Sequence, residues 1–128
     1  MSYYFTKIIS LPLEECRDKV EKELSDYGFG IVSEINMHEK FKGKLGVDFR
    51  PYKILGACSP KHAFEAVNAE EHIGLMLPCN IVLQEKKATE TEVSVIDPVA
   101  SMMAVQNPAL SDTAADIREK LKTFLENL

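Results

Sequence analysis

Residue types that could do chemistry gather in one stretch of the sequence, from Asp48 to Asn80. Cys58 is the strongest candidate in it, because it ends a predicted strand directly before a predicted helix start. The first turn of a helix leaves N–H groups free and carries positive potential, and both favour a thiolate. The alternative is a small, buried and inert thiol, since free cysteine is among the most buried residue types.

Cys79 follows Pro78 and precedes Asn80, at a point where proline interrupts a strand pattern. If the two strands are neighbours, Cys79 lies beside Cys58, and the pair could form a reversible disulfide. With His62 the two thiols could also hold a metal ion. Local zinc sites usually place ligands two to four residues apart, so the spacing of these three metal candidates argues only weakly for a metal.

His62 and Asp48 are the candidates for acid or base chemistry. His62 stands in the first turn of the predicted helix, four residues after Cys58, where a Cys–His nucleophilic pair is conceivable. The alternative is an exposed helical histidine without an orienting partner. Asp48 lies in a loop bounded by glycine and proline and could act as a base or bind a cation. Asp97, which precedes a proline, is typical of a turn.

The candidate catalytic residues are therefore Cys58, Cys79, His62 and Asp48, and the candidate ligand-binding residues are Cys58, Ser59, His62, Pro78, Cys79 and Asn80. The common hydrolase signatures Gly-x-Ser-x-Gly and His-Glu-x-x-His are absent, and no glycine-rich phosphate loop precedes the helix. The sequence shows no complete catalytic set and predicts no cofactor.

Alternating periods of two and of about 3.6 residues predict the strands and helices that position these side chains. The clearest helix begins at Pro12, carries one apolar stripe that includes Cys16 and Val20, and ends before Gly28. Ser59-Pro60 is a strong helix start. In chain order, the sequence predicts strands at 2–10, 29–37, 52–58, 81–85 and 91–96, a short helix or turn at 38–45, and helices at 12–27, 59–69 and from 111 onward.

This order of elements favours an α+β fold, with residues 1–128 as a single domain. Helices that connect strands, together with one clear hairpin at 81–96, predict a single mixed β-sheet of about five strands with helices mainly on one face.

Composition narrows the classes of function. The net charge of −5 argues against nucleic acid, whose phosphates attract clustered lysine and arginine. No apolar run reaches the roughly 18 residues that span a bilayer, so we expect no membrane insertion. The first residues lack the pattern of a signal peptide, and the three widely spaced cysteines are not a disulfide framework, so we expect a cytoplasmic protein.

Several short motifs follow one another along the chain. They are VDF at 47–49, YKILGACSP at 52–60, Ala63 with Ala66, IGLMLPCN at 73–80, and Asp97-Pro98 followed by Met102 or Met103. This set resembles the "domain of unknown function 302" family over nearly the whole chain. The resemblance implies a compact α/β fold and a homodimer, and it implies no activity. Ser59 departs from the asparagine that the family often has there, and both residues cap helices well.

The sequence thus predicts a small homodimeric protein that binds a small molecule or a partner and has no classical catalytic machinery. One alternative is a thiol-based redox or sulfur-transfer protein that uses Cys58 with Cys79, and another is a Cys/His metal-binding protein. Every one of these site hypotheses depends on one expectation: the end of the strand at 52–58 and the Pro78-Cys79-Asn80 break must meet in a shared pocket.

Overall fold

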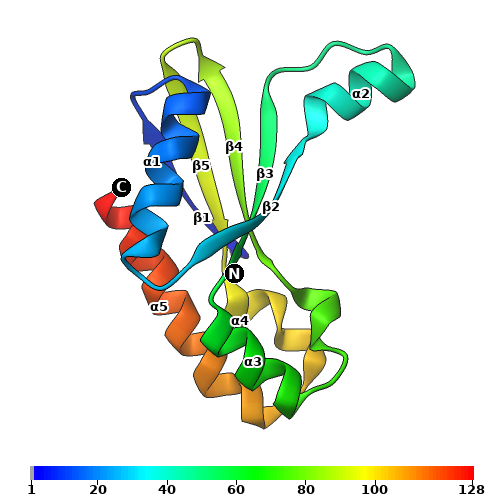
Figure 1. Ribbon diagram of the computed structural model, residues 1–128, viewed down its shortest axis with the longest axis vertical. Helices are drawn as coiled ribbons and strands as arrows, with labels where there is room; N and C mark the ends of the chain where they lie inside the picture. The colour runs from blue at the N-terminus through cyan, green and yellow to red at the C-terminus, as the bar shows by residue number, and fades with distance from the viewer. Residues whose placement is uncertain (1) are drawn as a thin grey trace.

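The computed structural model describes residues 2–128 and contains one five-stranded sheet (Figure 1). The strands are β1 (Tyr4–Ile9), β2 (Gly30–Asn36), β3 (Tyr52–Cys58), β4 (Cys79–Lys87) and β5 (Glu90–Ile96). The helices are α1 (Leu13–Ser25), α2 (Met37–Leu45), α3 (Pro60–Ala69), α4 (Pro98–Ser101) and α5 (Ser111–Asn127), with short 3-10 turns η1 (Ile73–Met76), η2 (Met103–Val105) and η3 (Pro108–Leu110). This content confirms the predicted α+β class and the five strands.

The prediction of a mixed sheet was wrong, because all four strand pairings are antiparallel in the order β1-β5-β4-β3-β2. A connecting helix makes neighbouring strands parallel only when it runs back along a face of the sheet. Here α3 packs beyond the end of the sheet, against α5 and η3, and η1 packs against α3. The chain therefore re-enters the sheet at the end where it left, and β4 runs opposite to β3.

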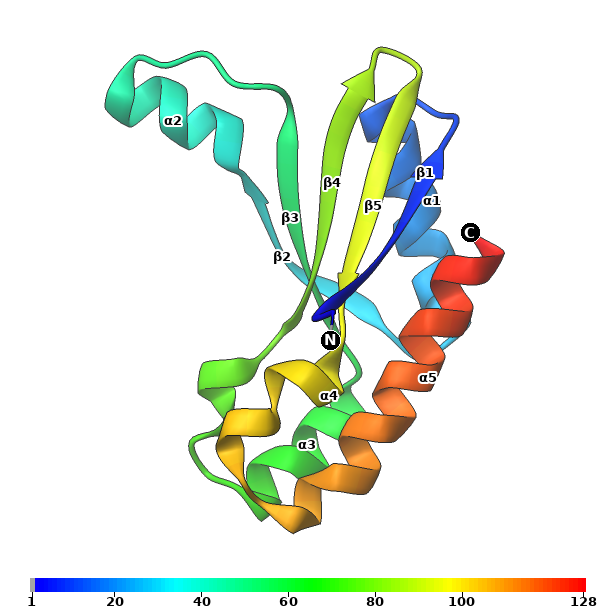
Figure 2. The same ribbon diagram turned by 180° about the vertical axis from the view of Figure 1, so that it is seen from behind.

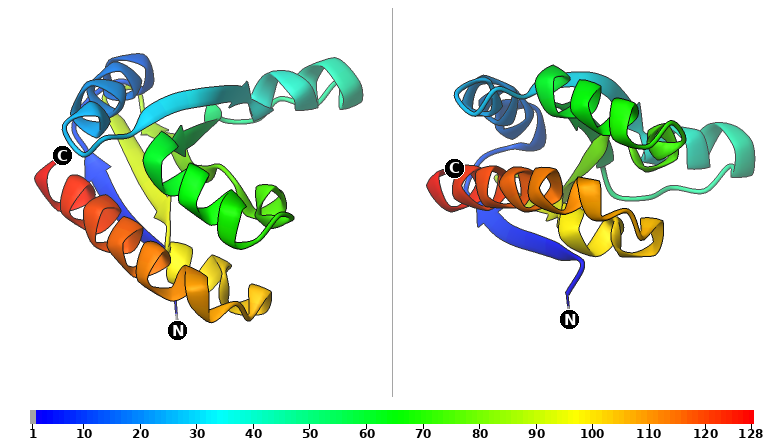
Figure 3. Two further views of the ribbon diagram at one scale, coloured as in Figure 1. Left: turned by 60° about the horizontal axis from the view of Figure 1, so that its bottom comes forward. Right: turned by 90° about the horizontal axis from the view of Figure 1, so that it is seen from below.

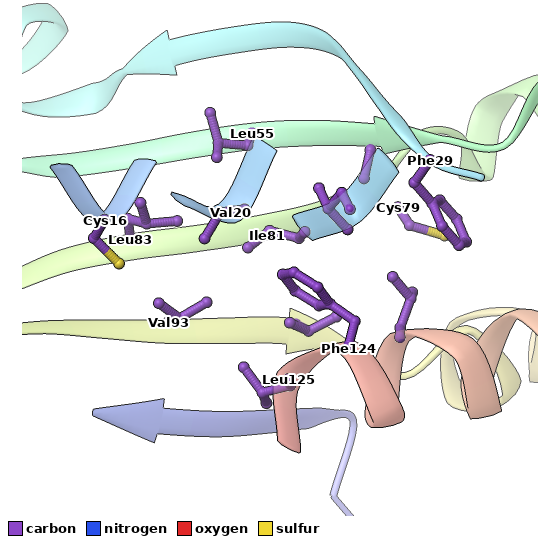
Figure 4. Packing of buried hydrophobic residues seen from close by; sticks show 14 of the residues in the cluster. Cys16, Val20, Phe29, Leu55, Cys79, Ile81, Leu83, Val93, Phe124 and Leu125 are labelled. Carbon is purple, nitrogen blue, oxygen red and sulfur yellow. The ribbon is translucent and has the colours of Figure 1, made fainter. Parts of the chain in front are cut away.

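The sheet has one covered and one uncovered face. Side chains alternate between the faces along each strand, as in the buried, half-buried pattern of β5. α1 and α5 cover the face that carries the buried positions, whereas the other face has no helix over it in residues 2–128 (Figure 2). The covered face holds the main core, which Figure 4 shows as a row of apolar side chains, among them Val20, Leu55, Ile81, Val93, Phe124 and Leu125.

The sequence pattern of α1 explains its packing. Leu13, Cys16, Val20 and Leu24 form the predicted apolar stripe, and all four are buried. The helix stops before Gly28, whose φ of 82° lies in the left-handed region that glycine adopts without steric cost. The predicted boundaries of this helix are therefore confirmed to within a few residues.

The remaining short elements gather at one end of the sheet. α3, α4 and η3 meet α5 there, and η1 packs against α3 (Figure 3). They share a second apolar cluster of Ala66, Ile73, Met102, Leu110 and Ala114. The apolar segment before Pro78 forms η1, and β4 begins only after the proline.

α2 and its flanking strand ends project from the body of the molecule as an arm (Figures 1 and 3). None of the residues of α2 is buried. Within residues 2–128, none of the helices combines the length and the apolar character needed to cross a bilayer.

Candidate functional site

The end of β3 and the beginning of β4 lie side by side. In the register of this strand pair, Ala57 is opposite Cys79 and Gly56 is opposite Asn80. The expected meeting of the 52–58 strand with the Pro78-Cys79-Asn80 segment is therefore confirmed.

Gly56 makes this meeting possible. A Cβ atom on Gly56 would lie 2.5 Å from Cγ of Pro78 and would overlap Oγ of Ser33. Real Cβ atoms do not approach other heavy atoms so closely, so the missing side chain leaves the space that the Pro78 ring occupies. Because Pro78 closes over the strand at this point, the segment before Cys79 lies directly beside the end of β3.

A small, partly enclosed cavity lies beside this junction, between the sheet end, α3 and the first turns of α5. Its volume is about 20 Å³, which is room for about one water molecule. Its walls are almost entirely apolar and include Phe29, Ala66, Leu77, Met102 and Ile117. Five of the predicted ligand-binding residues also line it, namely Cys58, Ser59, His62, Pro78 and Cys79.

The two cysteines differ in their environment. Cys58 is half-buried, whereas Cys79 is 7% exposed. Burial raises the pKa of the Cys79 thiol to about 11, and the proximity of Cys58 adds to the increase. Cys79 therefore stays protonated at neutral pH. Cys16, the third cysteine, lies on the buried side of α1, and burial raises the pKa of its thiol to about 11 as well.

A chain of hydrogen bonds crosses the wall of the cavity from α3 to α5. Oγ of Ser59 lies 2.7 Å from Nδ1 of His62, and Nε2 of His62 lies 2.6 Å from Oδ2 of Asp116. The carboxylate can only accept, so Nε2 of His62 donates to Asp116. In a neutral imidazole Nδ1 then accepts from the hydroxyl of Ser59. The alternative expectation of an exposed His62 was wrong, because the side chain is buried and has an orienting partner.

Asp116 is the member of this chain that the sequence did not suggest. It stands on the polar side of α5, far from the candidate residues in sequence, and no local motif marks it. Hydrogen bonds from His62 and Lys120 hold the pKa of the Asp116 carboxyl below its usual range. Asp116 is half exposed, so it connects the buried histidine with solvent.

The order Ser59–His62–Asp116 resembles the groups that activate a serine nucleophile, but its setting does not suit that chemistry. Ser59 is 8% exposed, and the neighbouring cavity is too small for an acyl substrate. The three residues instead join the start of α3 to α5 and satisfy buried polar atoms. They position the backbone next to Cys58.

Asp48 and Asn80 do not join this cluster. Asp48 lies in the loop between α2 and β3 and forms an exposed ion pair with Lys42 at 2.9 Å. Asn80 points to the uncovered face of the sheet, where it lines a separate hollow. Asp97, predicted as a turn former, caps α4 by accepting a hydrogen bond from the N–H of Val99 at 3.0 Å.

The metal hypothesis receives no support from the geometry. Among residues 2–128, no three His, Cys, Asp or Glu side chains stand in an arrangement that could hold a metal ion. Both ring nitrogens of His62 are already engaged by Ser59 and Asp116, which leaves no free lone pair for a metal.

Comparison with known proteins agrees with the motifs at this junction. The family model "Domain of unknown function DUF302" matches residues 5–128. The chain belongs to the DUF302 family. A crystal structure of a DUF302 protein from Bacillus stearothermophilus, described as an uncharacterized conserved protein, is 30% identical in sequence. Its TM-score is 0.89, and the match covers 98% of each chain. None of the curated proteins compared matches the sequence.

Membership of the family fixes the fold but brings no activity with it. The motif segments 52–60 and 73–80 build the junction and supply part of the lining of the small cavity. Within these segments, the hydroxyl of Ser59 forms a hydrogen bond with the imidazole of His62.

Proposed function

We propose that the protein is a homodimeric binding protein without classical catalytic machinery. One observation carries this proposal. Apolar side chains on the uncovered sheet face and on the projecting arm of α2 are exposed in the single chain. A large exposed apolar patch on a soluble protein commonly marks an interaction site.

The uncovered face is unusually apolar for a solvated sheet. Tyr4, Ile8 and Ile35 are exposed on it by 43%, 47% and 40%, and Ile54 and Val82 lie between them, half-buried. An antiparallel sheet that faces water normally shows polar residues at such positions. These side chains therefore suit contact with another surface.

The arm also exposes apolar side chains. Leu45 is 70% exposed and Val47 is 49% exposed. Phe49 packs edge-on against Phe41 with ring centroids 5.4 Å apart, which holds the returning loop against α2. The arm is therefore ordered although none of the residues of α2 is buried in one chain, and this makes it suitable for packing against a second chain.

Charge complementarity favours a second copy as the occupant. Residues 36–51 contain four basic and two acidic side chains, for a charge of +2. The rest of the chain has eleven basic and eighteen acidic side chains, for a charge of −7. The basic arm of one copy is therefore attracted to the acidic body of another, and this attraction steers association.

The available area is also consistent with a dimer. Five strands about 4.8 Å apart, with about six residues each at about 3.3 Å, give a face of roughly 500 Å². A stable interface covers about 800 Å² on each partner. α2, with a length of about 14 Å and a width of about 10 Å, adds roughly 150 Å². The face and the arm together approach the standard size, whereas the face alone does not.

A hollow on the same face could hold a small molecule. Its volume of about 340 Å³ falls within the range of about 300 to 1,000 Å³ that is common for ligand sites. A second copy over this face would close the hollow. Its lining combines aromatic rings with polar groups, namely Tyr3, Tyr4, Tyr52, Asn80, Gln84 and Glu92.

Size-exclusion chromatography with light scattering tests the dimer. Wild type should have the mass of two chains. Ile35→Glu should weaken the dimer by roughly tenfold or more, because burying an unpaired carboxylate costs at least about 1.4 kcal/mol. Leu75→Glu is the matched control, since Leu75 is 85% exposed on η1, away from this face. A monomeric wild type, or equal effects of the two variants, would contradict the proposal.

Two further parts of the proposal concern the chain as a whole. We place the protein in the cytoplasm, since all three cysteines are free, as is usual in a reducing compartment.

We also treat residues 1–128 as one domain, which requires a single cooperative unfolding transition. Two separate transitions in calorimetry would contradict it.

Thiol chemistry at Cys58 with Cys79, as redox or sulfur transfer, is a second candidate function. The observation that favours it is the shared cavity: both cysteines line it, one half-buried and one buried. Iodoacetamide should label Cys58 in the native protein much faster than Cys16 or Cys79. Equal labelling of the three, or none at Cys58, would count against this candidate.

A further inference from the structure

We propose that the hollow on the uncovered sheet face binds a planar nitrogen heterocycle that carries an amino group beside a ring nitrogen, as adenine does. This inference rests on the proposed function and deepens it, because it names the chemical class of the small molecule that the face would hold. The ligand is the free base or its nucleoside, without phosphate.

The strand registers place three lining residues of the hollow side by side. Tyr52 on β3 is opposite Gln84 on β4, and Gln84 is opposite Glu92 on β5. Residues that are directly opposite in an antiparallel pair point to the same face and have Cβ atoms about 4.5 to 5.5 Å apart. An aromatic ring, an amide and a carboxylate therefore follow one another across the uncovered face (Figure 2).

Hydrogen bonds from Arg50 determine which end of the Gln84 amide faces the hollow. Oε1 of Gln84 lies 3.0 Å from Nε of Arg50 and 2.7 Å from one of its terminal nitrogens. A guanidinium can only donate, so the atom of the amide that faces it must be the oxygen. The NH2 group of Gln84 therefore points away from Arg50 and can donate to a ligand.

Glu92 supplies an acceptor next to this donor. Its carboxylate oxygens lie 3.7 Å from Nζ of Lys86 and 3.5 Å from Oγ of Ser94. Both contacts are long for hydrogen bonds, so the carboxylate can still accept one from a ligand. The side chains of Gln84 and Glu92 have equal length, and both polar ends can therefore reach the same ligand edge.

A donor beside an acceptor is complementary to a ligand edge that carries an acceptor beside a donor. Adenine has such an edge, because its ring nitrogen N1 accepts and the neighbouring amino group donates. N1 can accept from Gln84 while the amino group donates to Glu92. Amide side chains and carboxylates recognise the polar edges of bases in this way in other proteins.

The aromatic residues of the hollow suit a planar ligand. The ring of Tyr52 lies 6.3 Å from that of Phe49, and the rings of Tyr3 and Tyr4 pack edge to face at 5.1 Å, as measured between centroids. Bases stack readily on such rings. The volume of about 340 Å³ is near the lower end of the range for ligand sites, which fits a nucleoside better than a large cofactor.

The charge of the lining argues against a phosphate on the ligand. Among residues 2–128, Glu92 is the only charged residue that lines the hollow. Arg50 is engaged by Gln84, and Lys86 lies against Glu92. Phosphate sites usually contain arginine or lysine that contacts the anion directly. A phosphate in this hollow would instead meet a carboxylate.

NMR titration of the ¹⁵N-labelled full-length protein with adenosine tests the inference. We expect the side-chain NH2 signals of Gln84 and the backbone amides of β4 and β5 to shift. Purine riboside, which is adenosine without the amino group, should bind roughly tenfold more weakly, because it cannot donate to Glu92. Adenosine 5′-phosphate should bind no more tightly than adenosine.

A matched pair of variants tests the donor. Gln84→Glu removes the NH2 group but keeps an oxygen for Arg50, so it should fold and should bind adenosine roughly tenfold more weakly. Gln106→Glu makes the same change at a residue that follows η2, beyond the end of the sheet, and should leave binding unchanged. Circular dichroism checks the fold of both variants.

Light scattering on the same samples separates this inference from the dimer. A dimeric wild type that binds no adenosine, or that binds adenosine and purine riboside equally, would overturn the inference and leave the homodimeric binding protein standing. A monomeric wild type that binds no adenosine would overturn both. Tighter binding of adenosine 5′-phosphate, or equal losses in the two variants, would also overturn the inference.

Discussion

Two regions of the molecule differ in how their side chains pack. One is the end of the sheet where the small cavity lies between α3 and α5, called the closed end here, and the other is the uncovered sheet face. At the closed end, small residues and a proline bring backbone segments so close that only about one water fits between them, and the polar side chains there bond one another. On the uncovered face, apolar and polar side chains stand side by side with a shallow hollow and no covering element. The closed end is complete within one chain, whereas the uncovered face lacks a partner.

This difference indicates which kind of change each region tolerates. A tightly packed region responds to the addition or removal of single atoms, because interiors are packed about as densely as organic crystals. A mutation on an uncovered face changes the affinity between chains rather than the stability of one chain. The change that a mutation makes in the free energy of unfolding therefore distinguishes the two regions.

The largest effect is expected from neighbouring residues of β4 that point to opposite faces. Ile81 is fully buried in the core, and Ile81→Ala should lower the free energy of unfolding by about 2 to 5 kcal/mol through lost contacts and a cavity. Val82 lies half-buried on the uncovered face, and Val82→Ala should cost less than about 1 kcal/mol. Urea denaturation of both variants, at a protein concentration low enough to keep the chain monomeric, measures the difference, and similar losses would show that part of the same chain covers the second face.

A smaller effect is expected where a side chain is added to the closed end. Gly56→Ala should cost about 2 kcal/mol, because the new methyl group meets Pro78 and Ser33 in a space that cannot expand freely. In thermal unfolding this corresponds to a decrease in Tm of about 8 °C. Gly74→Ala is the control, since a Cβ there meets nothing within 4 Å. Equal Tm values for the two variants would mean that Pro78 can move aside.

The smallest effect is expected at Asp116, where the closed end meets solvent. Its pKa is lowered in the folded protein, chiefly by the hydrogen bond from His62, so its charge stabilises the fold above the ordinary pKa of aspartate. That contribution is lost as the pH falls through the lowered value. Asp116 is half exposed, so Asp116→Asn should cost less than about 1 kcal/mol at neutral pH.

Urea denaturation from neutral to acidic pH checks this dependence. The difference between wild type and Asp116→Asn should shrink toward zero in acid. Glu65→Gln, which changes an exposed carboxyl on α3, is the control and should show no such trend. A difference that grows as the pH falls would contradict the assigned role of the carboxylate.

The sequence predicts those features that depend on neighbouring residues. The stripe of α1, the start of α3 at Ser59-Pro60 and the β4–β5 hairpin follow from local spacing, and the structure confirms all three. The sequence left open whether the strand that ends at Cys58 and the strand that begins at Cys79 are neighbours; the register shows that the two strands pair, with Ala57 opposite Cys79.

The features that the sequence did not predict depend on distant segments. The direction of β4 follows from the packing of α3 against α5 beyond the sheet end, which no periodicity encodes. Asp116 meets His62 only because α5 passes the start of α3. A carboxylate on the polar side of a helix looks the same in sequence whether or not a buried imidazole lies beside it.

The placement of the first two strands at opposite edges of the sheet has a consequence for the order of folding. β2 to β5 pair with their neighbours in the chain, whereas β1 pairs with β5, so that Thr6 contacts Ser94 across 88 residues of sequence. Closing the longest loop costs the most chain entropy, so we expect β1 to dock last. In pulse-labelling hydrogen exchange during refolding, the amides of β1 should gain protection after those of β3 and β4, and early protection of β1 would refute this order.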